Sequence, residues 1–80
     1  GQRCTSLRRL LLHRSIAPTF RARLQAAYAQ VRIGDPLDPT TLMGPLINAR
    51  AVANYQRAID DIRAQGGEIL HGGQVREGNY

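Results

Sequence analysis

The fold class is decided by one stretch, Arg9-Leu10-Leu11-Leu12-His13-Arg14-Ser15-Ile16-Ala17-Pro18, in which a short apolar run passes directly into a helix start. The leucines between charged or polar flanks have the length of a buried strand of a sheet. Ser15 offers an N-cap, and Pro18 falls in the first turn, where its missing N–H costs nothing. Because a strand that leads into a helix is half of a βαβ unit, the stretch predicts an α/β fold.

The helix after this strand is predicted from about residue 16 to residue 31. Its apolar side chains recur at a spacing of four, which places them on one helix face and makes the helix amphipathic. These side chains are Ile16, Phe20, Leu24 and Tyr28.

Residues 34–45 have the composition of an irregular connection, because their prolines and glycines interrupt both helix and strand. A second helix is expected to begin at Asn48, a good N-cap, and to end at Gly66, a natural C′ residue. A second short strand is predicted at residues 68–71, and Gly72-Gly73 turns the chain again. The expected order is therefore strand, helix, loop, helix, strand, an excerpt of a parallel sheet that needs further strands.

Length and composition narrow the class of protein. Eighty residues make about one small domain or a piece of a larger one, which excludes two domains. A single cysteine excludes a disulfide scaffold. No apolar run approaches the ~20 residues of a membrane span, and no signal peptide is visible. We therefore expect a soluble, cytoplasmic chain with no membrane partner.

The basic charge favours a polyanion partner only weakly. Eleven basic residues against six acidic ones give a net charge of +5, and every basic residue is an arginine. The arginines are scattered, and only residues 3–14 are dense in arginine without any acid. An Arg-rich module that binds nucleic acid or another polyanion is one alternative function, although aromatic residues are few. A purely structural, non-catalytic α/β segment is another. We expect no nucleic-acid partner.

Cys4 is the candidate nucleophile. Arg3 before it and Arg8 and Arg9 after it favour the thiolate, which is the reactive form of cysteine. The alternative is a small buried apolar residue, since free cysteines often have that role. A metal site is not expected, because Cys4 and the two histidines lack the spacing of metal ligands.

Several motifs together resemble the NAD(P)-dependent aldehyde dehydrogenase superfamily. Gly1-Gln2-Arg3-Cys4-Thr5 resembles the signature that carries the catalytic cysteine of the family. Gly34-Asp35-Pro36-x-Asp38 and Gly44-Pro45 resemble the turn after its helix. The resemblance covers essentially all 80 residues and continues through Gln65-Gly66-Gly67, Gly72-Gly73 and Gly78-Asn79-Tyr80. The branch most similar to the chain is that of the α-aminoadipic semialdehyde (piperideine-6-carboxylate) dehydrogenases, the antiquitins, which implies lysine catabolism.

The resemblance implies a role for each of two neighbouring residues. Cys4 would attack an aldehyde to give a thiohemiacetal, and loss of hydride to NAD, or to NADP, would give a thioester that water hydrolyses. The Cys4 backbone N–H would be one donor of the oxyanion hole. Arg3 would bind the polar head of the substrate, since its planar guanidinium suits a carboxylate. The alternative for Arg3 is a solvated or structural charge.

The chain departs from the family pattern where cofactor contacts are expected. Ala51 and Asn54 stand at positions that hold Gln and Lys in many relatives, so neither is assigned to the cofactor, and Arg50 nearby is not assigned either. The Gly-rich cofactor loop, the water-activating glutamate and the oxyanion Asn are absent from the chain. Residues 1–80 are thus expected to be an incomplete segment of a catalytic domain, without the cofactor-binding domain and inactive alone. The full-length protein is expected to be a homo-oligomer.

Overall fold

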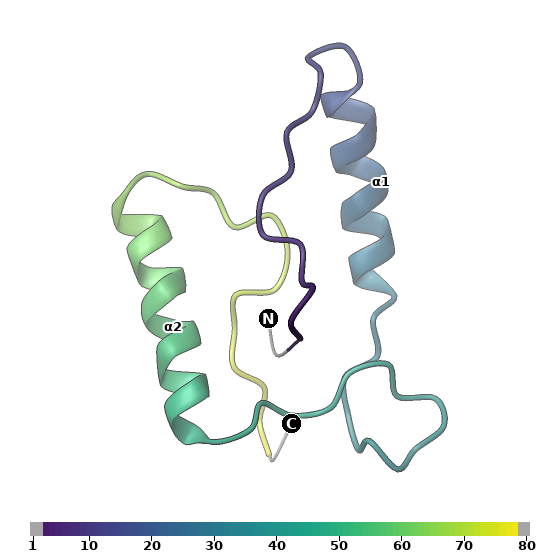
Figure 1. Ribbon diagram of the computed structural model, residues 1–80, viewed down its shortest axis with the longest axis vertical. Coiled ribbons are helices and arrows are strands. Elements are labelled where there is room, and N and C mark those ends of the chain that lie inside the picture. The colour runs from purple at the N-terminus through teal and green to yellow at the C-terminus, as the bar shows by residue number, and fades with distance from the viewer. Residues whose placement is uncertain (1–2, 79–80) are drawn as a thin grey trace.

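A computed structural model describes residues 3–78, and in that range the secondary structure consists of two helices (Figure 1). Helix α1 spans Ala17–Ala29 and helix α2 spans Ala49–Ala64. The chain between them, about residues 30–48, is irregular and contains one isolated parallel bridge between Ile33 and Met43. Neither described helix has the length and apolarity that crossing a membrane requires.

Helix α1 confirms the predicted helix but not its predicted cap. The N-cap residue is Ile16, which has no capping side chain, and Pro18 lies in the first turn as expected. The Ser15 hydroxyl instead lies 2.8 Å from Nδ1 of His13. A cap at Ser15 would also place Pro18 at N3, where proline has no N–H for the hydroxyl to accept. The Ser15 cap is therefore a wrong prediction.

Helix α2 begins and ends as the sequence predicts. The Asn48 side chain accepts a hydrogen bond from the Ala51 N–H at 2.9 Å. At the other end Gly66 has a φ of +81°, which a residue with a Cβ rarely adopts. The Gly66 N–H donates to the Arg63 carbonyl, and the Gly67 N–H donates to the Ile62 carbonyl at 2.8 Å. These two bonds form a Schellman motif, the expected stop for a helix.

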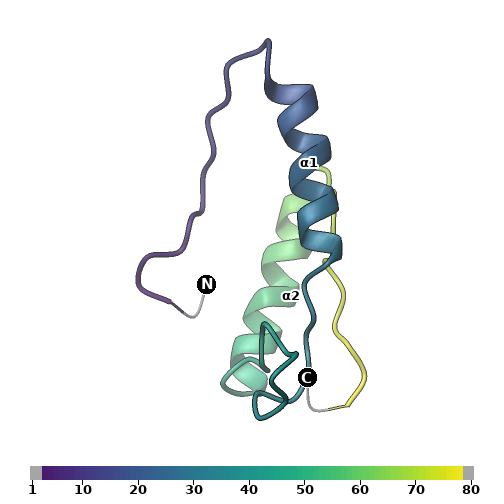
Figure 2. The same ribbon diagram turned by 90° about the vertical axis from the view of Figure 1, so that its right-hand side faces the viewer.

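The two predicted strands are not formed in residues 3–78, so the prediction of a sheet excerpt is not confirmed. Residues 9–13 and 68–71 are both coil, without a ladder of backbone hydrogen bonds. Figure 2 shows the first segment on one side of α1 and the second on the other. The physical reason is that a strand needs backbone hydrogen bonds to a neighbouring strand, and neither segment forms a ladder with another described segment.

The described residues enclose no core. No residue in the range 3–78 is buried, and large apolar side chains such as Leu11, at 97% exposure, stand in solvent. The accessible surface is 7348 Å², whereas a compact protein of this mass exposes roughly 4,800 Å². The radius of gyration is 14.4 Å, against roughly 11.6 Å for a compact domain of the same length. The chain is therefore an open arrangement of two helices.

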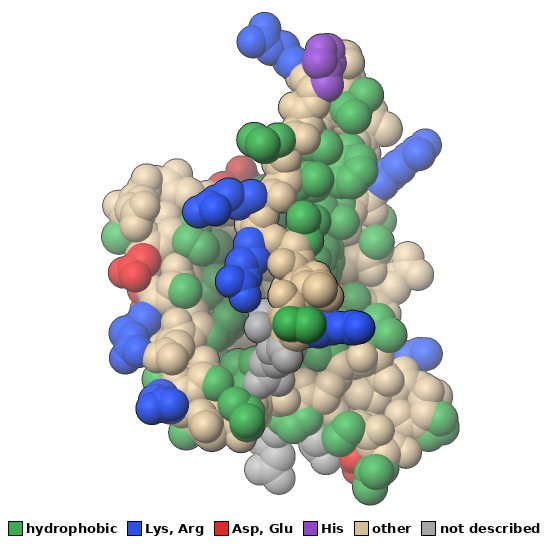
Figure 3. Space-filling model, viewed as in Figure 1, with side chains coloured by type: hydrophobic (Ala, Val, Ile, Leu, Met, Phe, Trp, Pro, Cys, Tyr) green, Lys and Arg blue, Asp and Glu red, His purple; other side chains and the backbone are tan. Residues whose placement is uncertain are grey.

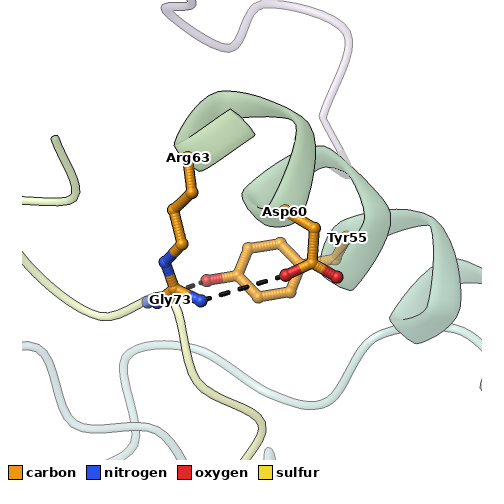
Figure 4. A network of polar contacts seen from close by, with 4 residues as sticks. All are labelled: Tyr55, Asp60, Arg63 and Gly73. Carbon is orange, nitrogen blue, oxygen red and sulfur yellow. Dashed lines mark hydrogen bonds and ion pairs between the residues drawn. The ribbon is translucent and has the colours of Figure 1, made fainter. Parts of the chain in front are cut away.

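The helices make no contact with each other, and residues 68–73, here called the bridging segment, join them. Gln25 of α1 donates from Nε2 to the Leu70 carbonyl at 3.1 Å. The Gly73 N–H donates to the Tyr55 hydroxyl of α2, also at 3.1 Å (Figure 4). The rings of Tyr28 and His71 are tilted against each other with centroids 6.1 Å apart. The arrangement of α1 relative to α2 thus depends on the bridging segment.

Replacing the cap of α2 tests the local origin of this helix. We expect Asn48→Ala to destabilise the helix by about 0.5–1 kcal/mol, because the Ala51 N–H loses its side-chain acceptor. Asn48→Asp keeps an acceptor and serves as the matched control. Circular dichroism of a peptide spanning residues 46–68 measures the change. Equal helicity in the Asn48→Ala peptide and the parent peptide would show that the bond contributes nothing.

Candidate functional site

Cys4 lies in a turn at the start of the described chain. Its thiol is free and exposed, in residues 3–5, which precede the coil that leads to α1. The Ser6 hydroxyl donates a hydrogen bond to the Arg3 carbonyl at 2.9 Å. This bond spans Cys4 and fixes the backbone on either side of it, so the thiol projects from a turn whose shape is set locally. Such a thiol is accessible to an electrophile.

Arg3 stands next to the thiol with its guanidinium in solvent. It is exposed, and the only ion pair in the described range joins Arg63 to Asp60 at 3.9 Å (Figure 4). The bond from Ser6 holds the Arg3 backbone while leaving the side chain available. The turn therefore contains a free thiol and, next to it in the sequence, an arginine that takes part in no ion pair among residues 3–78. Gly1-Gln2, the first half of the signature, lies outside the described residues, as does Asn79-Tyr80.

The described residues do not assemble a metal site. Among residues 3–78 no group of three His, Cys, Asp or Glu side chains is close enough to hold a metal ion. Cys4, His13 and His71 lie in separate parts of the chain: the first turn, the turn before α1 and the bridging segment.

The loop 34–45 is irregular, as predicted, but it is held by hydrogen bonds that sequence reasoning missed. The Asp35 carboxylate accepts the Leu37 N–H at 2.9 Å, and the Asp38 carboxylate accepts the Thr40 N–H at 2.7 Å. Arg32 donates from Nε to the Thr40 carbonyl at 2.7 Å. The signal was present in the sequence, since an aspartate commonly accepts the N–H two residues further on. The Gly-Asp-Pro-x-Asp motif therefore has a structural role.

The Asp38 carboxylate is the group whose ionisation the loop changes. The Thr40 N–H, and next the Thr40 hydroxyl, hold the pKa of Asp38 below its usual value of 3.8. A hydrogen bond to the charged form favours that form.

The positions considered for a cofactor offer little to bind one. Arg50 is exposed in the first turn of α2. Ala51 has no polar side chain, and its N–H is used by Asn48. The Asn54 side-chain oxygen accepts a hydrogen bond from Arg57. All three residues stay without an assigned role.

Open apolar grooves lie on either side of the bridging segment and away from Cys4. The first lies between α1, α2 and the bridging segment, and its lining includes Leu24, Tyr28 and Ile59. The second lies between α1 and the coil before it, and its lining includes Leu12 and Phe20. Figure 3 shows apolar side chains gathered between α1 and the coil before it. Neither lining includes Cys4 or Arg3, so both residues lie outside these two grooves.

The chain belongs to the aldehyde dehydrogenase family, whose profile matches residues 1–80. It is 48% identical to the α-aminoadipic semialdehyde dehydrogenase of Mus musculus over 82 aligned positions, which cover 100% of this chain and 15% of the relative. It is 49% identical to aldehyde dehydrogenase family 7 member A1 of Pisum sativum, covering 100% of this chain and 16% of that protein. The chain spans about 15% of the length of these relatives. The family resemblance found in the sequence, including its branch, is confirmed.

The lowered pKa of Asp38 gives a test of the loop. A carboxylate whose pKa is depressed stabilises the folded loop above its ordinary pKa, and this contribution is lost as the pH falls through the depressed value. We expect Thr40→Val to raise the pKa only part of the way to 3.8, because the Thr40 N–H remains. Carbon-detected NMR titration of Asp38 measures it, with Thr41→Val as the matched control. If the pKa of Asp38 in Thr40→Val equals that in the parent, the Thr40 hydroxyl does not contribute to lowering it.

Proposed function

We propose that the whole protein oxidises an aldehyde, α-aminoadipic semialdehyde, to the carboxylic acid with NAD or NADP as the hydride acceptor. The observation that carries this proposal is identity near 48% along the entire chain to a relative whose name states that substrate. The exposed, free thiol of Cys4 supports it, because oxidation of an aldehyde through a thioester needs an accessible sulfur nucleophile.

Cys4 carries the covalent chemistry in this proposal. Its thiolate sulfur attacks the carbonyl carbon, and a C–S bond forms as the carbonyl oxygen becomes an oxyanion of a thiohemiacetal. The bound cofactor supplies the acceptor for the hydride that leaves this carbon, which restores the C=O bond as a thioester. Water then adds to the thioester and the C–S bond breaks, so that the carboxylic acid is released and the remaining proton of the water returns to the Cys4 sulfur, which leaves as the thiol. The Cys4 backbone N–H is proposed to donate to the oxyanion.

Arg3 is proposed to hold the amino-acid end of the substrate. Its guanidinium is exposed and takes part in no described ion pair, and its fork of N–H donors matches a carboxylate. The Ser6 bond to the Arg3 carbonyl fixes the backbone from which the side chain reaches. The substrate carboxylate would thus be bound by the residue beside the nucleophile.

The cofactor is proposed to bind to parts of the protein other than the described residues of this chain. Ala51 has no polar side chain, and the Asn54 amide oxygen is engaged by Arg57. Residues 1–80 are accordingly proposed to be a segment of the catalytic domain that is inactive alone. We propose a homo-oligomer for the whole protein. The lone cysteine favours a reducing compartment such as the cytoplasm.

The sheet is also proposed for the whole protein. Residues 9–13 and 68–71 have strand-like sequences, and apolar grooves border both segments. Pairing with further strands would satisfy their backbone groups and cover the apolar faces of both helices.

Removing the thiol tests the nucleophile. We expect Cys4→Ala in the whole protein to lower kcat for aldehyde oxidation by about 10³-fold or more, the scale on which loss of a covalent nucleophile acts. Thr19→Ala, a substitution on the exposed surface of α1, is the control for handling and folding. The measurement is the steady-state rate of NAD(P)H formation. A Cys4→Ala enzyme that retains its rate would place the nucleophile elsewhere.

Removing the guanidinium tests substrate recognition. We expect Arg3→Gln to lower kcat/KM for α-aminoadipic semialdehyde by roughly 10- to 100-fold, because a charged hydrogen bond to the carboxylate is lost. A simple alkanal has no carboxylate, so its kcat/KM should stay within about twofold. Arg3→Lys keeps the charge without the fork and should fall in between. Equal losses for both aldehydes would instead assign Arg3 a structural role.

A further inference from the structure

The turn before α1, at the top of Figure 1, is anchored on a single histidine. The Ser15 N–H donates to Nδ1 of the His13 ring at 3.2 Å. The N–H groups of Ile16 and Ala17 both donate to the His13 carbonyl at 3.1 Å. Consecutive N–H groups at the start of the helix thus find their acceptors on one residue. No other side chain caps this end of α1.

This geometry assigns a protonation state to the ring. A backbone N–H can only donate, so Nδ1 of His13 must accept, and the ring proton lies on Nε2. The Ser15 hydroxyl, 2.8 Å from the same nitrogen, then donates to it as well. A protonated imidazole donates from both nitrogens and has no lone pair for the Ser15 N–H. The bond from the Ser15 N–H to the ring is therefore one that the neutral form of His13 can accept.

The sequence around His13 is basic. Arg14 follows His13 directly, and Arg21 and Arg23 are exposed on α1. Residues 1–34 contain no acidic residue, and the only ion pair in the described range lies in α2. A helix N-terminus carries partial positive charge, which disfavours a cation nearby. No described group compensates a protonated His13.

We propose that the His13–Ser15 turn is a pH-sensitive start of α1, closed by neutral His13 and loosened by its protonation. Histidine is the side chain that can change charge between about pH 5 and pH 8. Protonation removes the acceptor of the Ser15 N–H and places a cation at the helix N-terminus. The hydrogen bonds of this turn lie within residues 13–17, so they do not depend on which groups cover the apolar faces of the two helices. This pH sensitivity is independent of the proposed aldehyde oxidation.

Hydrogen–deuterium exchange of the whole protein tests this proposal. Peptides that cover residues 13–20 are compared at pH 8 and pH 5 after correction for intrinsic exchange. We expect roughly two- to tenfold faster corrected exchange at pH 5, the range expected for loss of one hydrogen bond. The start of α2 is the internal reference, since its cap, Asn48, does not titrate. A wild-type ratio of one, or the same change at α2, would overturn the proposal.

Two histidine variants separate this turn from other titrations. His13→Asn supplies a side-chain oxygen that accepts the N–H two residues on and does not titrate, so the pH difference should vanish. His71→Asn removes the other histidine, which lies against Tyr28 of α1, and the pH difference should persist. A difference that survives His13→Asn, or that disappears in His71→Asn, would contradict the assignment to His13.

Discussion

The bridging segment is the constraint on which the rest of the structure depends. The helices have no contact with each other, so their relative placement rests on the bonds from Gln25 to Leu70 and from Gly73 to Tyr55. A hydrogen bond of this kind contributes about 1 kcal/mol, and none of these residues is buried. Each helix is well defined internally by its own hydrogen bonds. The placement of one helix relative to the other is held by far fewer hydrogen bonds.

The parts of the fold that the sequence predicts are those with local causes. The Asn48 cap and the Gly66 stop follow from residue types that act within one helical turn, and both are present. The Ser15 cap failed for an equally local reason, because His13 competes for the hydroxyl and Pro18 lacks an N–H. The Gln25–Leu70 bond joins residues 45 apart, and no local pattern indicates it. The predicted strands are not confirmed, because strand pairing is a property of two segments.

In the candidate site, too, the features with local causes are the ones that the sequence predicts. Cys4 and Arg3 were selected from a signature in consecutive residues, and the structure adds the turn that the Ser6 hydroxyl closes around them. The aspartates of the loop at residues 34–45 were recognised as a motif, yet their turns become evident only when each carboxylate is seen to accept an N–H. Near the start of α2, the Ala51 N–H donates to Asn48 and the Asn54 oxygen accepts from Arg57, and neither bond is evident from the family resemblance. The remaining groups of the proposed reaction are proposed to lie in other parts of the protein.

The most direct test of the central claim, that Cys4 forms the covalent bond to the substrate, is mass mapping of the reacting enzyme. The whole protein is mixed with α-aminoadipic semialdehyde and NAD, quenched in acid during turnover and digested, and the peptide that contains Cys4 is weighed. We expect an acyl adduct on Cys4 that appears in the pre-steady state and declines as substrate is consumed. Turnover without an adduct on this peptide, or with an adduct on a different residue, would contradict it.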